Sequence, residues 1–350
     1  IKFVLDALYG ATNEPMGTSY RSRFNKSEYI YAGKTGTSQI RTITQEEREL
    51  KIKNKDLMNL MDMTVSELHE VLDLAVEMKK NRGSEVKSLI GKTIGLIFLK
   101  SSTRTRVSFE TGVHELGGYP MYLDQSGLQL GRGESFEDTA KVLSRYLHGI
   151  VIRGHEHDLI KQFADAAEIP VINALTDLYH PCQLLADMQT IREQFGRVEG
   201  IKAAFIGDTA CNMSNSWILA ASMMGMELRL GGPQEFHPDL SILPGVNKDL
   251  ISIHEDPKEA VKGVDVVYTD VWVSMGFEEE SKERLKILQP YQVNSELLSH
   301  ASDDVRVMHC LPAYRGQEIT AEVLESKASV IWDEAENRLH AQKAMMALKF

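Results

Sequence analysis

The chain has 350 residues, of which 43% are hydrophobic and 25% are charged, a composition typical of a globular protein with two cores. Its net charge of -11 argues against a nucleic-acid partner, because a long phosphate backbone would be repelled. Three cysteines argue against a disulfide framework, and no apolar run approaches the roughly 20 residues that span a bilayer. We therefore expect a cytoplasmic protein without nucleic-acid or membrane partners.

From Gly91 onward, short apolar runs alternate with longer amphipathic ones, a pattern typical of βαβ units. Gly117 and Gly118 are expected to end the helix after the first strand. The predicted strands of the first half are Gly91–Leu99, Gly149–Arg153 and Pro170–Leu175, and the predicted helices are Leu57–Leu74, Thr103–Leu116, Ser135–Leu147, Asp158–Glu168 and Pro181–Phe195.

The same alternation continues in the second half of the chain. The predicted strands are Ile201–Gly207, Glu227–Leu230, Val264–Val271 and Val305–Cys310, and the predicted helices are Met213–Met224, Gln289–His300 and an amphipathic Asp333–Leu348. The expected fold class is α/β, with two open parallel-sheet domains joined by long helices. We expect the first domain to span residues 55–185, completed by the C-terminal helix 333–350, and the second to span 186–332.

The segment Lys100–Arg106 (KSSTRTR) follows the first predicted strand and opens a helix. Free backbone N–H groups and the positive end of the helix dipole meet there, which favours an anion. Hydroxyl groups add donors, and Arg104 and Arg106 can present guanidinium forks to phosphate oxygens. An ordinary helix cap with two solvated arginines is the alternative, and the density of donors at a strand-to-helix junction speaks against it.

Residues 102–106, read Ser-Thr-Arg-Thr-Arg, resemble the carbamoyl-phosphate signature of the aspartate and ornithine carbamoyltransferase family, and the resemblance covers nearly all of Lys55–Phe350. It implies that Ser102, Thr103, Arg104 and Thr105 bind the phosphate, whereas Arg106 is structural and pairs with acidic groups.

Three further side chains are expected near the carbonyl group of the substrate. Arg153 ends a predicted strand, and His180 and Gln183 lie at the start of a predicted helix. Ligands of open α/β sheets bind at such strand ends, and charge developing on a carbonyl oxygen needs preorganised donors. The family resemblance implies that the arginine and histidine bind the carbonyl oxygen and that the glutamine binds the amide hydrogens. Alone, each could be a solvated strand end or a helix cap.

Two more residues are assigned by the resemblance alone. Gln129, in Gly127–Ser135, matches a loop that reaches the phosphate site of a neighbouring subunit, which implies a homotrimer. Arg338, in Glu334–His340, matches an arginine of the C-terminal helix that touches carbamoyl phosphate. The alternative for Arg338 is an exposed ion pair with Glu334, which contributes little stability.

The second domain is expected to select the acceptor amine. Asp270–Gly276 follows a predicted strand and resembles the Ser-Met-Gly loop of the family's ornithine branch, in which the aspartate, Ser274 and Met275 bind the amino-acid end. His309–Pro312 resembles the segment in which the cysteine and leucine lie beside the δ-amine, which implies roles for Cys310 and Leu311. Without that context, a lone cysteine is a small buried hydrophobe. Asn212 matches the asparagine that holds the α-carboxylate.

The resemblance implies transfer of the carbamoyl group from carbamoyl phosphate to the δ-amine of L-ornithine, with Arg104, Arg153, His180 and Cys310 as the catalytic residues and with no metal or organic cofactor. Ornithine must attack as its neutral amine, so the rate should rise with pH. Three alternatives stay open: another acceptor such as putrescine or an acylated ornithine, a silent binding paralogue, and a cell-wall module based on the N-terminus.

The N-terminal fifty residues lack the βα alternation. Tyr31–Gln39 contains a Lys-Thr-Gly box at positions 34–36, and the stretch Lys2–Glu49 resembles the end of a penicillin-binding transpeptidase domain. The Ser-x-x-Lys box with its nucleophilic serine is missing. We therefore expect residues 1–54 to be a transpeptidase-like fragment without a function of its own.

Overall fold

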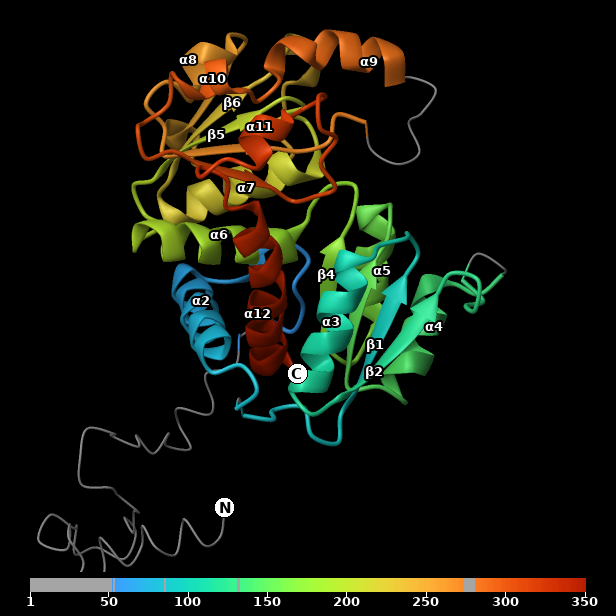
Figure 1. Cartoon of the computed structure of the whole chain (residues 1–350). Helices are drawn as coiled ribbons and strands as arrows, with labels where there is room; N and C mark the ends of the chain where they lie inside the picture. Colours follow the sequence, from blue (N-terminus) through green and yellow to red (C-terminus); the bar gives the residue numbers. More distant parts are fainter. Residues whose placement is uncertain (1–51, 53, 85, 131–132, 274–280) are drawn as a thin grey trace, which may run out of the picture. The chain divides into compact units, whose positions relative to one another are not determined.

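The computed structural model describes residues 52, 54–84, 86–130, 133–273 and 281–350, so the predicted transpeptidase-like fragment lies almost wholly outside the described residues. Within that part of the chain, two parallel sheets with helices on both faces are present, which confirms the expected α/β fold class (Figure 1). None of the described helices is long and apolar enough to cross a membrane.

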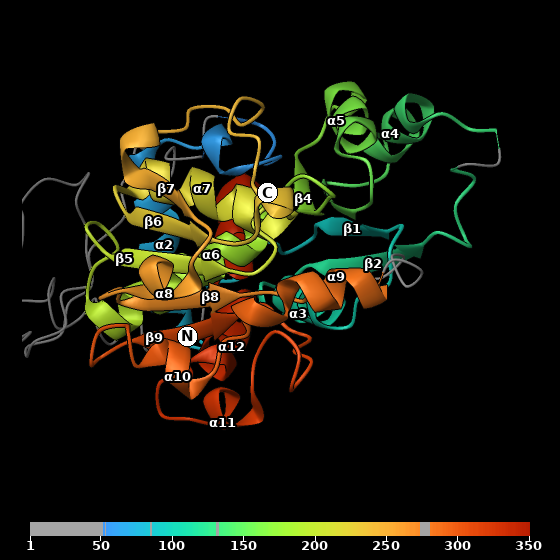
Figure 2. The same ribbon diagram turned by 90° about the horizontal axis from the view of Figure 1, so that it is seen from above.

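The first sheet has four parallel strands in the order β2-β1-β3-β4. Helix α3 covers one face and α4 and α5 cover the other (Figure 2). The strands are β1 (Thr93–Phe98), β2 (Tyr119–Asp124), β3 (Gly149–Arg153) and β4 (Val171–Leu175), and the helices are α3 (Arg104–Glu115), α4 (Phe136–Ser144) and α5 (His157–Ala166).

The second sheet has five parallel strands in the order β7-β6-β5-β8-β9. Alternation along β5 explains how both faces are covered: Ala203 and Phe205 pack into the core beside α7, whereas Ala204 and Ile206 pack into the core beside α8. The strands are β5 (Lys202–Ile206), β6 (Glu227–Gly231), β7 (Ile251–His254), β8 (Val266–Thr269) and β9 (Arg306–His309). The helices are α7 (Asn212–Met224), α8 (Pro257–Val261), α9 (Ser281–Leu288), α10 (Ser295–Leu298) and α11 (Ala321–Leu324).

Three long helices lie together beside the sheets: α2 (Val65–Lys80), α6 (Pro181–Phe195) and α12 (Ile331–Lys349). Helix α12 packs against α2, α3 and α6 (Figure 1). The expected amphipathic character of this last helix is wrong, because it is buried around most of its circumference. Its buried polar side chains are Glu334, Asn337, Arg338, His340, Gln342, Lys343 and Lys349.

Two helix predictions are also wrong in their extent. The expected helix Leu57–Leu74 is instead a short 3₁₀ turn, Leu60–Asp62, followed by α2, because Thr64 and Glu67 form a capping box that starts a new helix. The expected helix Gln289–His300 is a 3₁₀ turn, Gln289–Tyr291, followed by the four-residue α10. Asn294 caps α10 and thereby separates the two turns.

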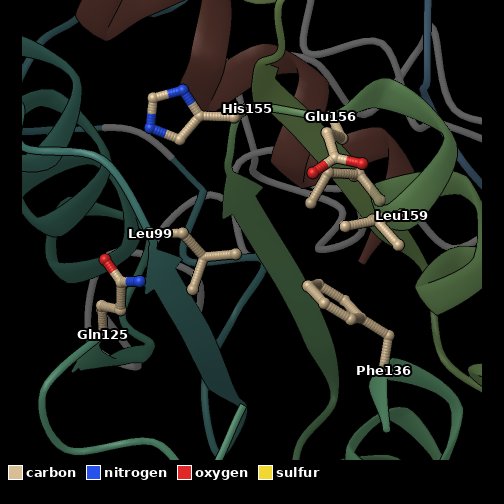
Figure 3. Close-up of a pocket in the computed structure, with 7 residues that line it drawn as sticks. Leu99, Gln125, Phe136, His155, Glu156 and Leu159 are labelled. Atoms are coloured by element: carbon tan, nitrogen blue, oxygen red, sulfur yellow. The ribbon is translucent and has the colours of Figure 1, made fainter. Parts of the chain in front are cut away.

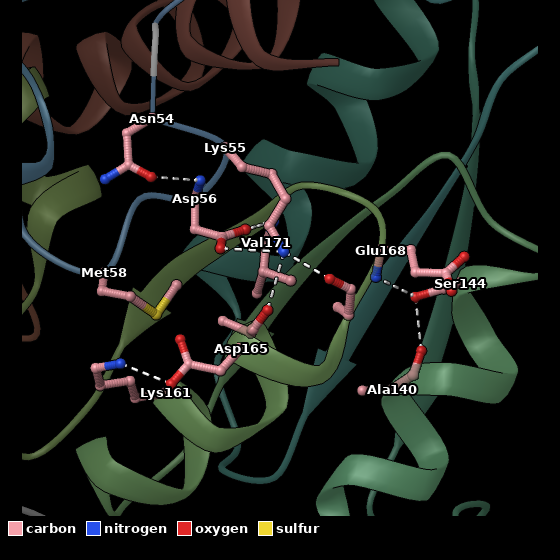
Figure 4. Close-up of polar contacts among 12 residues, drawn as sticks. Asn54, Lys55, Asp56, Met58, Ala140, Ser144, Lys161, Asp165, Glu168 and Val171 are labelled. Atoms are coloured by element: carbon pink, nitrogen blue, oxygen red, sulfur yellow. Dashed lines mark hydrogen bonds and ion pairs between the residues drawn. The ribbon is translucent and has the colours of Figure 1, made fainter.

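Residues 54–58 join the edge of the first sheet (Figure 4). Leu57 forms a parallel bridge to Ile172 beside β4, and a carboxylate oxygen of Asp56 accepts from the backbone N–H of Val171 at 2.8 Å. The Lys55 amine donates to the carbonyl oxygens of Ala164 and Ala167 at 3.0 and 2.6 Å, near the C-terminal end of α5. The α/β architecture therefore includes the chain from about Lys55, where the sequence resemblance begins.

Candidate active site

The predicted phosphate loop connects β1 to α3. Helix α3 begins at Arg104, and the Ser102 hydroxyl accepts a hydrogen bond from the backbone N–H of Thr105 at 3.3 Å. Thr105 is buried, whereas Thr103 and Arg104 are exposed at the helix start. The loop thus presents hydroxyl groups, a guanidinium and the positive end of a helix dipole at one place.

A cavity of about 400 Å³ lies beside this helix start, within the usual size range of small-molecule sites. It contains predicted residues of both substrate groups, because Arg104 and Arg338 line it together with Cys310. The full lining is Arg82, Thr103, Arg104, Val107, Ser108, Thr111, Gln183, His309, Cys310, Glu334, Ala335, Glu336, Arg338 and Leu339.

Thr105 connects two of the predicted arginines. Its hydroxyl oxygen accepts from Arg153 Nη1 and from Arg338 Nη2, each at 3.3 Å. Burial, together with the positive charges of Arg338 and Arg104, lowers the pKa of Arg153 to about 10. Arg153 therefore remains charged at neutral pH, and the mutual repulsion of the three guanidinium groups favours a polyanionic ligand.

His180 precedes α6, where it is buried close to the arginines. Burial, followed by the charges of Arg338 and Arg153, lowers the pKa of the imidazole well below 6.5, so the ring is neutral at physiological pH. Its Nδ1 atom and the Nε atom of Arg153 have no hydrogen-bond partner among the described residues. Buried polar atoms are rarely left unpaired, so these two fit a site for a polar ligand group.

Gln183 and Arg338 are joined directly, because Arg338 Nη1 donates to the side-chain oxygen of Gln183. With its amide oriented to satisfy both neighbours, Gln342 also accepts from Arg338, at 2.9 Å from Nη2 and 3.1 Å from Nε. Arg338 is 5% exposed, so the alternative of an exposed ion pair with Glu334 is wrong. Arg106 lies outside the cavity, paired with Glu110 at 3.0 Å and with its guanidinium 3.5 Å from the Tyr122 ring centroid, as its structural role predicts.

The second sheet contributes the other wall. The Cys310 thiol donates to a carboxylate oxygen of Asp270 at 3.0 Å, and these residues follow β9 and β8 respectively. Burial, together with the Asp270 charge, raises the pKa of the thiol well above 9, so the sulfur is a protonated donor and a poor nucleophile. Leu311 has a φ of 59°, in the left-handed region that non-glycine residues seldom adopt.

His309 is held by two neighbours. Its Nδ1 accepts from the Leu311 backbone N–H at 2.9 Å, so Nε2 carries the proton toward Glu318 Oε1, 3.1 Å away. Asp270, His309 and Cys310 are close enough together to hold a metal ion, but the imidazole has no free lone pair to offer one.

The remaining predicted residues differ in position. Asn212 opens α7, and its amide donates to the Thr176 carbonyl at 2.7 Å, which leaves one amide hydrogen free. Ser274 and Met275 lie outside the described residues, so their predicted role is untested. Gln129 is exposed on the loop after β2 and does not line the cavity of its own chain.

A second hollow, of about 180 Å³, lies at the carboxyl ends of β1 and β3 (Figure 3). None of the predicted substrate residues lines it. Phe136, Leu159 and Leu99 form its apolar side, and Gln125, His155 and Glu156 surround them.

Several residues with polar contacts in or beside the larger cavity, at the start of α3, were not predicted from the sequence. Glu334 and Asp187 are fully buried acids next to Gln183, and the Tyr268 hydroxyl donates to Glu334 at 3.3 Å. Arg284 of α9 donates to the Trp272 carbonyl oxygen and pairs with Asp208. A partial signal was present, because Glu334 precedes Arg338 by one helical turn and Asp187 follows Gln183 by one.

Comparison with known proteins agrees with this arrangement. Residues 55–193 match the family model "Aspartate/ornithine carbamoyltransferase, carbamoyl-P binding domain", and residues 199–349 match its "Asp/Orn binding domain" counterpart.

The matches to individual relatives extend over nearly the whole length of each relative. The chain is 48% identical over 304 residues to an ornithine carbamoyltransferase of Carboxydothermus hydrogenoformans, covering 85% of this chain and 97% of that protein. It is 51% identical over 298 residues to that of Methanothermobacter thermautotrophicus, covering 83% and 97%. The solved structure of the Pyrococcus furiosus ornithine carbamoyltransferase matches with a TM-score of 0.81 and 44% identity, covering 84% of this chain and 96% of that one. With both family models matched in order over most of its length, the chain belongs to the aspartate/ornithine carbamoyltransferase family.

Proposed function

We propose that this protein is an ornithine carbamoyltransferase, which transfers the carbamoyl group of carbamoyl phosphate to the δ-amine of L-ornithine and releases citrulline and phosphate. One observation carries the proposal: Arg104 and Arg338 line the same cavity as Cys310, whose thiol donates to Asp270 of the second sheet. A phosphate subsite and an amine subsite are thereby neighbours. The names of the relatives support the same reaction.

In the proposed binding mode, the start of α3 and the arginines hold the phosphate. Ser102, Thr103, Arg104 and Thr105 supply hydroxyl, backbone and guanidinium donors, and Arg338 adds a second cation. Arg153 and neutral His180 donate to the carbonyl oxygen, using atoms that have no partner among the described side chains. Gln183 accepts from the carbamoyl amide.

Ornithine occupies the other side of the cavity. Asp270 pairs with its α-ammonium group and Asn212 binds its carboxylate, while Ser274 and Met275 are proposed to complete this end. The Cys310 thiol and the Leu311 carbonyl position the δ-amine. Because the thiol is protonated, we assign it a positioning role and no covalent intermediate.

The reaction is a direct displacement. The neutral δ-amine forms a bond to the carbamoyl carbon, the bond from that carbon to the phosphate oxygen breaks, and the amine proton passes to the departing phosphate. Charge that develops on the carbonyl oxygen is stabilised by Arg153 and His180. No step needs a metal or an organic cofactor.

We also propose that the protein is a cytoplasmic homotrimer. The exposed position of Gln129, on a loop that does not reach the cavity of its own chain, supports donation of this side chain to a neighbouring subunit. The hollow in Figure 3 lies beside that loop and offers an apolar surface to a second copy. We retain residues 55–185 with 333–350, and 186–332, as the domain division, and residues 1–54 as a fragment without its own activity.

The decisive experiment is an assay of citrulline formation with carbamoyl phosphate and a panel of acceptors: ornithine, putrescine, N-acetylornithine and aspartate. Each acceptor gives its own carbamoylated product, so phosphate release is measured beside citrulline. We expect turnover with ornithine alone, because putrescine and N-acetylornithine lack the free amino-acid end that Asp270 and Asn212 bind, and aspartate lacks the δ-amine. Preference for putrescine or the acetylated amine would replace this function with that of a related transferase.

A further inference from the structure

Helices α6 and α12 pack against each other (Figure 1), and two carboxyl groups are buried there. Asp187 of α6 and Glu334 of α12 are both 0% exposed, and the Gln183 amide nitrogen donates to both acids at 2.9 Å, so the two carboxyl groups lie beside each other. Two ionised carboxylates this close, away from solvent, repel each other strongly, and one proton shared between them relieves the repulsion.

The donors around the pair are unevenly distributed. Glu334 accepts from the His309 backbone N–H at 2.8 Å and from the Tyr268 hydroxyl at 3.3 Å. Gln183 Nε2 donates to both acids, at 2.9 Å in each case. Asp187 Oδ2 has no hydrogen-bond partner within the described part of the chain, and a proton held between the two acids would supply one.

The side-chain amide of Gln183 has a single favourable orientation in this arrangement. Both hydrogens of its amide are used by the two acids, so its side-chain oxygen must point away from them, toward Arg338. A carboxylate can only accept hydrogen bonds, so a flipped amide would turn its oxygen onto negative charge. The acids thus decide which end of the amide faces the cavity.

We propose that Asp187 and Glu334 share one proton and carry a single negative charge, and that this pair is a positioning device which fixes the Gln183 oxygen toward the substrate. The second half of this statement rests on the proposed function, because the oxygen then faces the carbamoyl NH₂ group. The pair would thereby give the site its preference for an amide over a methyl group at that position.

Electrostatics support the assignment. Burial raises the pKa of Asp187 to about 7, and burial together with the Asp187 charge raises the pKa of Glu334 well above its usual value. The titratable groups that face the pair are Arg338 on α12, Tyr268 on β8, His309 on β9, and Cys310 and Asp270 just beyond those strands. Among these groups the Arg338 guanidinium and the Tyr268 hydroxyl favour negative charge on the acids, and the guanidinium reaches the pair through Gln183.

The proton can be tested without turnover. Infrared spectra of the intact protein at pH 7.5 should contain a protonated-carboxyl band that is lost in both Asp187→Asn and Glu334→Gln, since each variant leaves one ionised acid. Asp333→Asn, an exposed neighbour of Glu334 on the same helix, should keep the band. A wild-type spectrum without the band, or single variants that retain it, would overturn the shared proton.

The positioning role is tested by ligand choice. Acetyl phosphate has a methyl group in place of the carbamoyl NH₂, so the ratio of its Kd to that of carbamoyl phosphate, measured by calorimetry, reports the orientation of Gln183. We expect the ratio to change less than about threefold in either single variant. It should fall at least fivefold in the double variant, because the two amides that replace the acids can pair with the Gln183 amide in either of its orientations. An unchanged ratio in a folded double variant would refute the role.

The experiments distinguish failure of the positioning role from failure of the proposed function. If the double variant does not fold, Asp187→Ala, which removes one acceptor but leaves Glu334, should lower the ratio partially, and an unchanged ratio would count against the proposal. Failure of wild-type protein to make citrulline would contradict the proposed function and leave the infrared result untouched.

Discussion

Thr105 and Arg338, separated by 233 positions in the chain, meet in the cavity: the Thr105 hydroxyl accepts from Arg338 Nη2 at 3.3 Å. Thr105 lies in the first turn of α3, and Arg338 lies in the last helix. Two segments far apart in the chain therefore build one anion site, and a change in either segment should affect the same kinetic constant.

Replacing Arg338 with lysine should lower kcat/KM for carbamoyl phosphate about 10- to 100-fold, because a hydrogen bond to a charged group contributes about 1.5–3 kcal/mol. A lysine keeps the charge but cannot reach Thr105 and Gln183 together. Steady-state citrulline assays would measure the change. Arg315→Lys, at an exposed ion pair with Glu325, serves as the control and should resemble wild type. A loss of kcat/KM smaller than twofold in Arg338→Lys would show that the two-pronged guanidinium is not needed.

Arg104→Ala should nearly abolish turnover, with a fall in kcat of at least roughly 100-fold, the effect of removing one preorganised donor from a transition-state site. The guanidinium lines the cavity at the start of α3, so its removal leaves the fold intact. Arg145→Ala removes an exposed arginine that pairs with Glu168 and is the matched control. Wild-type kinetics in Arg104→Ala would contradict the phosphate assignment.

The pKa of His180 gives a pH prediction. Because burial lowers this pKa well below 6.5, the imidazole stays neutral as pH falls through 6.5 and gains a proton only at much lower pH. Between pH 6 and 8, kcat/KM for carbamoyl phosphate should have no inflection from a histidine. Over the same range, kcat/KM for ornithine should rise about tenfold per pH unit, as the neutral δ-amine becomes more abundant. An ionisation near 6.5 that disappears in His180→Asn would refute the assignment.

Arg284 should affect ornithine and not carbamoyl phosphate. It pairs with Asp208 after β5 and donates to the Trp272 carbonyl oxygen, which holds the chain on which Asp270 lies, while its guanidinium stacks 4.4 Å from the Phe236 ring centroid. Arg284→Gln should raise KM for ornithine at least about fivefold, the loss of roughly 1 kcal/mol. KM for carbamoyl phosphate should change less than twofold. Lys286→Gln, an exposed cation on the same helix, controls for charge. Equal changes in both KM values would indicate a general loss of folding.

The sequence was informative where chemistry depends on position along a strand. Buried strands such as Gly149–Arg153 are short continuous apolar runs, and Arg153 at the carboxyl end of this one donates to Thr105 in the first turn of α3. Two of the edge strands, β2 and β7, were not predicted. Both are partly exposed: β7 (ISIH) alternates apolar and polar residues, and along β2 (YPMYLD) exposed and half-buried positions alternate over most of its length.

Burial of polar side chains was harder to foresee. The pattern of α12 predicts an exposed polar face, because charged residues are rarely buried unless they are paired. Here Glu334 is paired with Asp187, and Lys343 with Glu115 at 2.6 Å, contacts between segments far apart in the chain. Such partners become visible only once the tertiary fold is known. Arg338 lines the cavity, and its burial contradicts only the alternative interpretation, an exposed ion pair with Glu334.

The burial of α12 also bears on how the protein is made. The residues of both sheets are synthesised before those of α12. Helix α12 supplies Arg338 and Glu334 to the cavity and packs against α2, α3 and α6. A nascent chain with both sheets complete would still lack a competent anion site and would expose the apolar surfaces that α12 covers. Ligand binding is therefore a late event in biosynthesis, and a product truncated before Ile331 would be inactive and prone to aggregation.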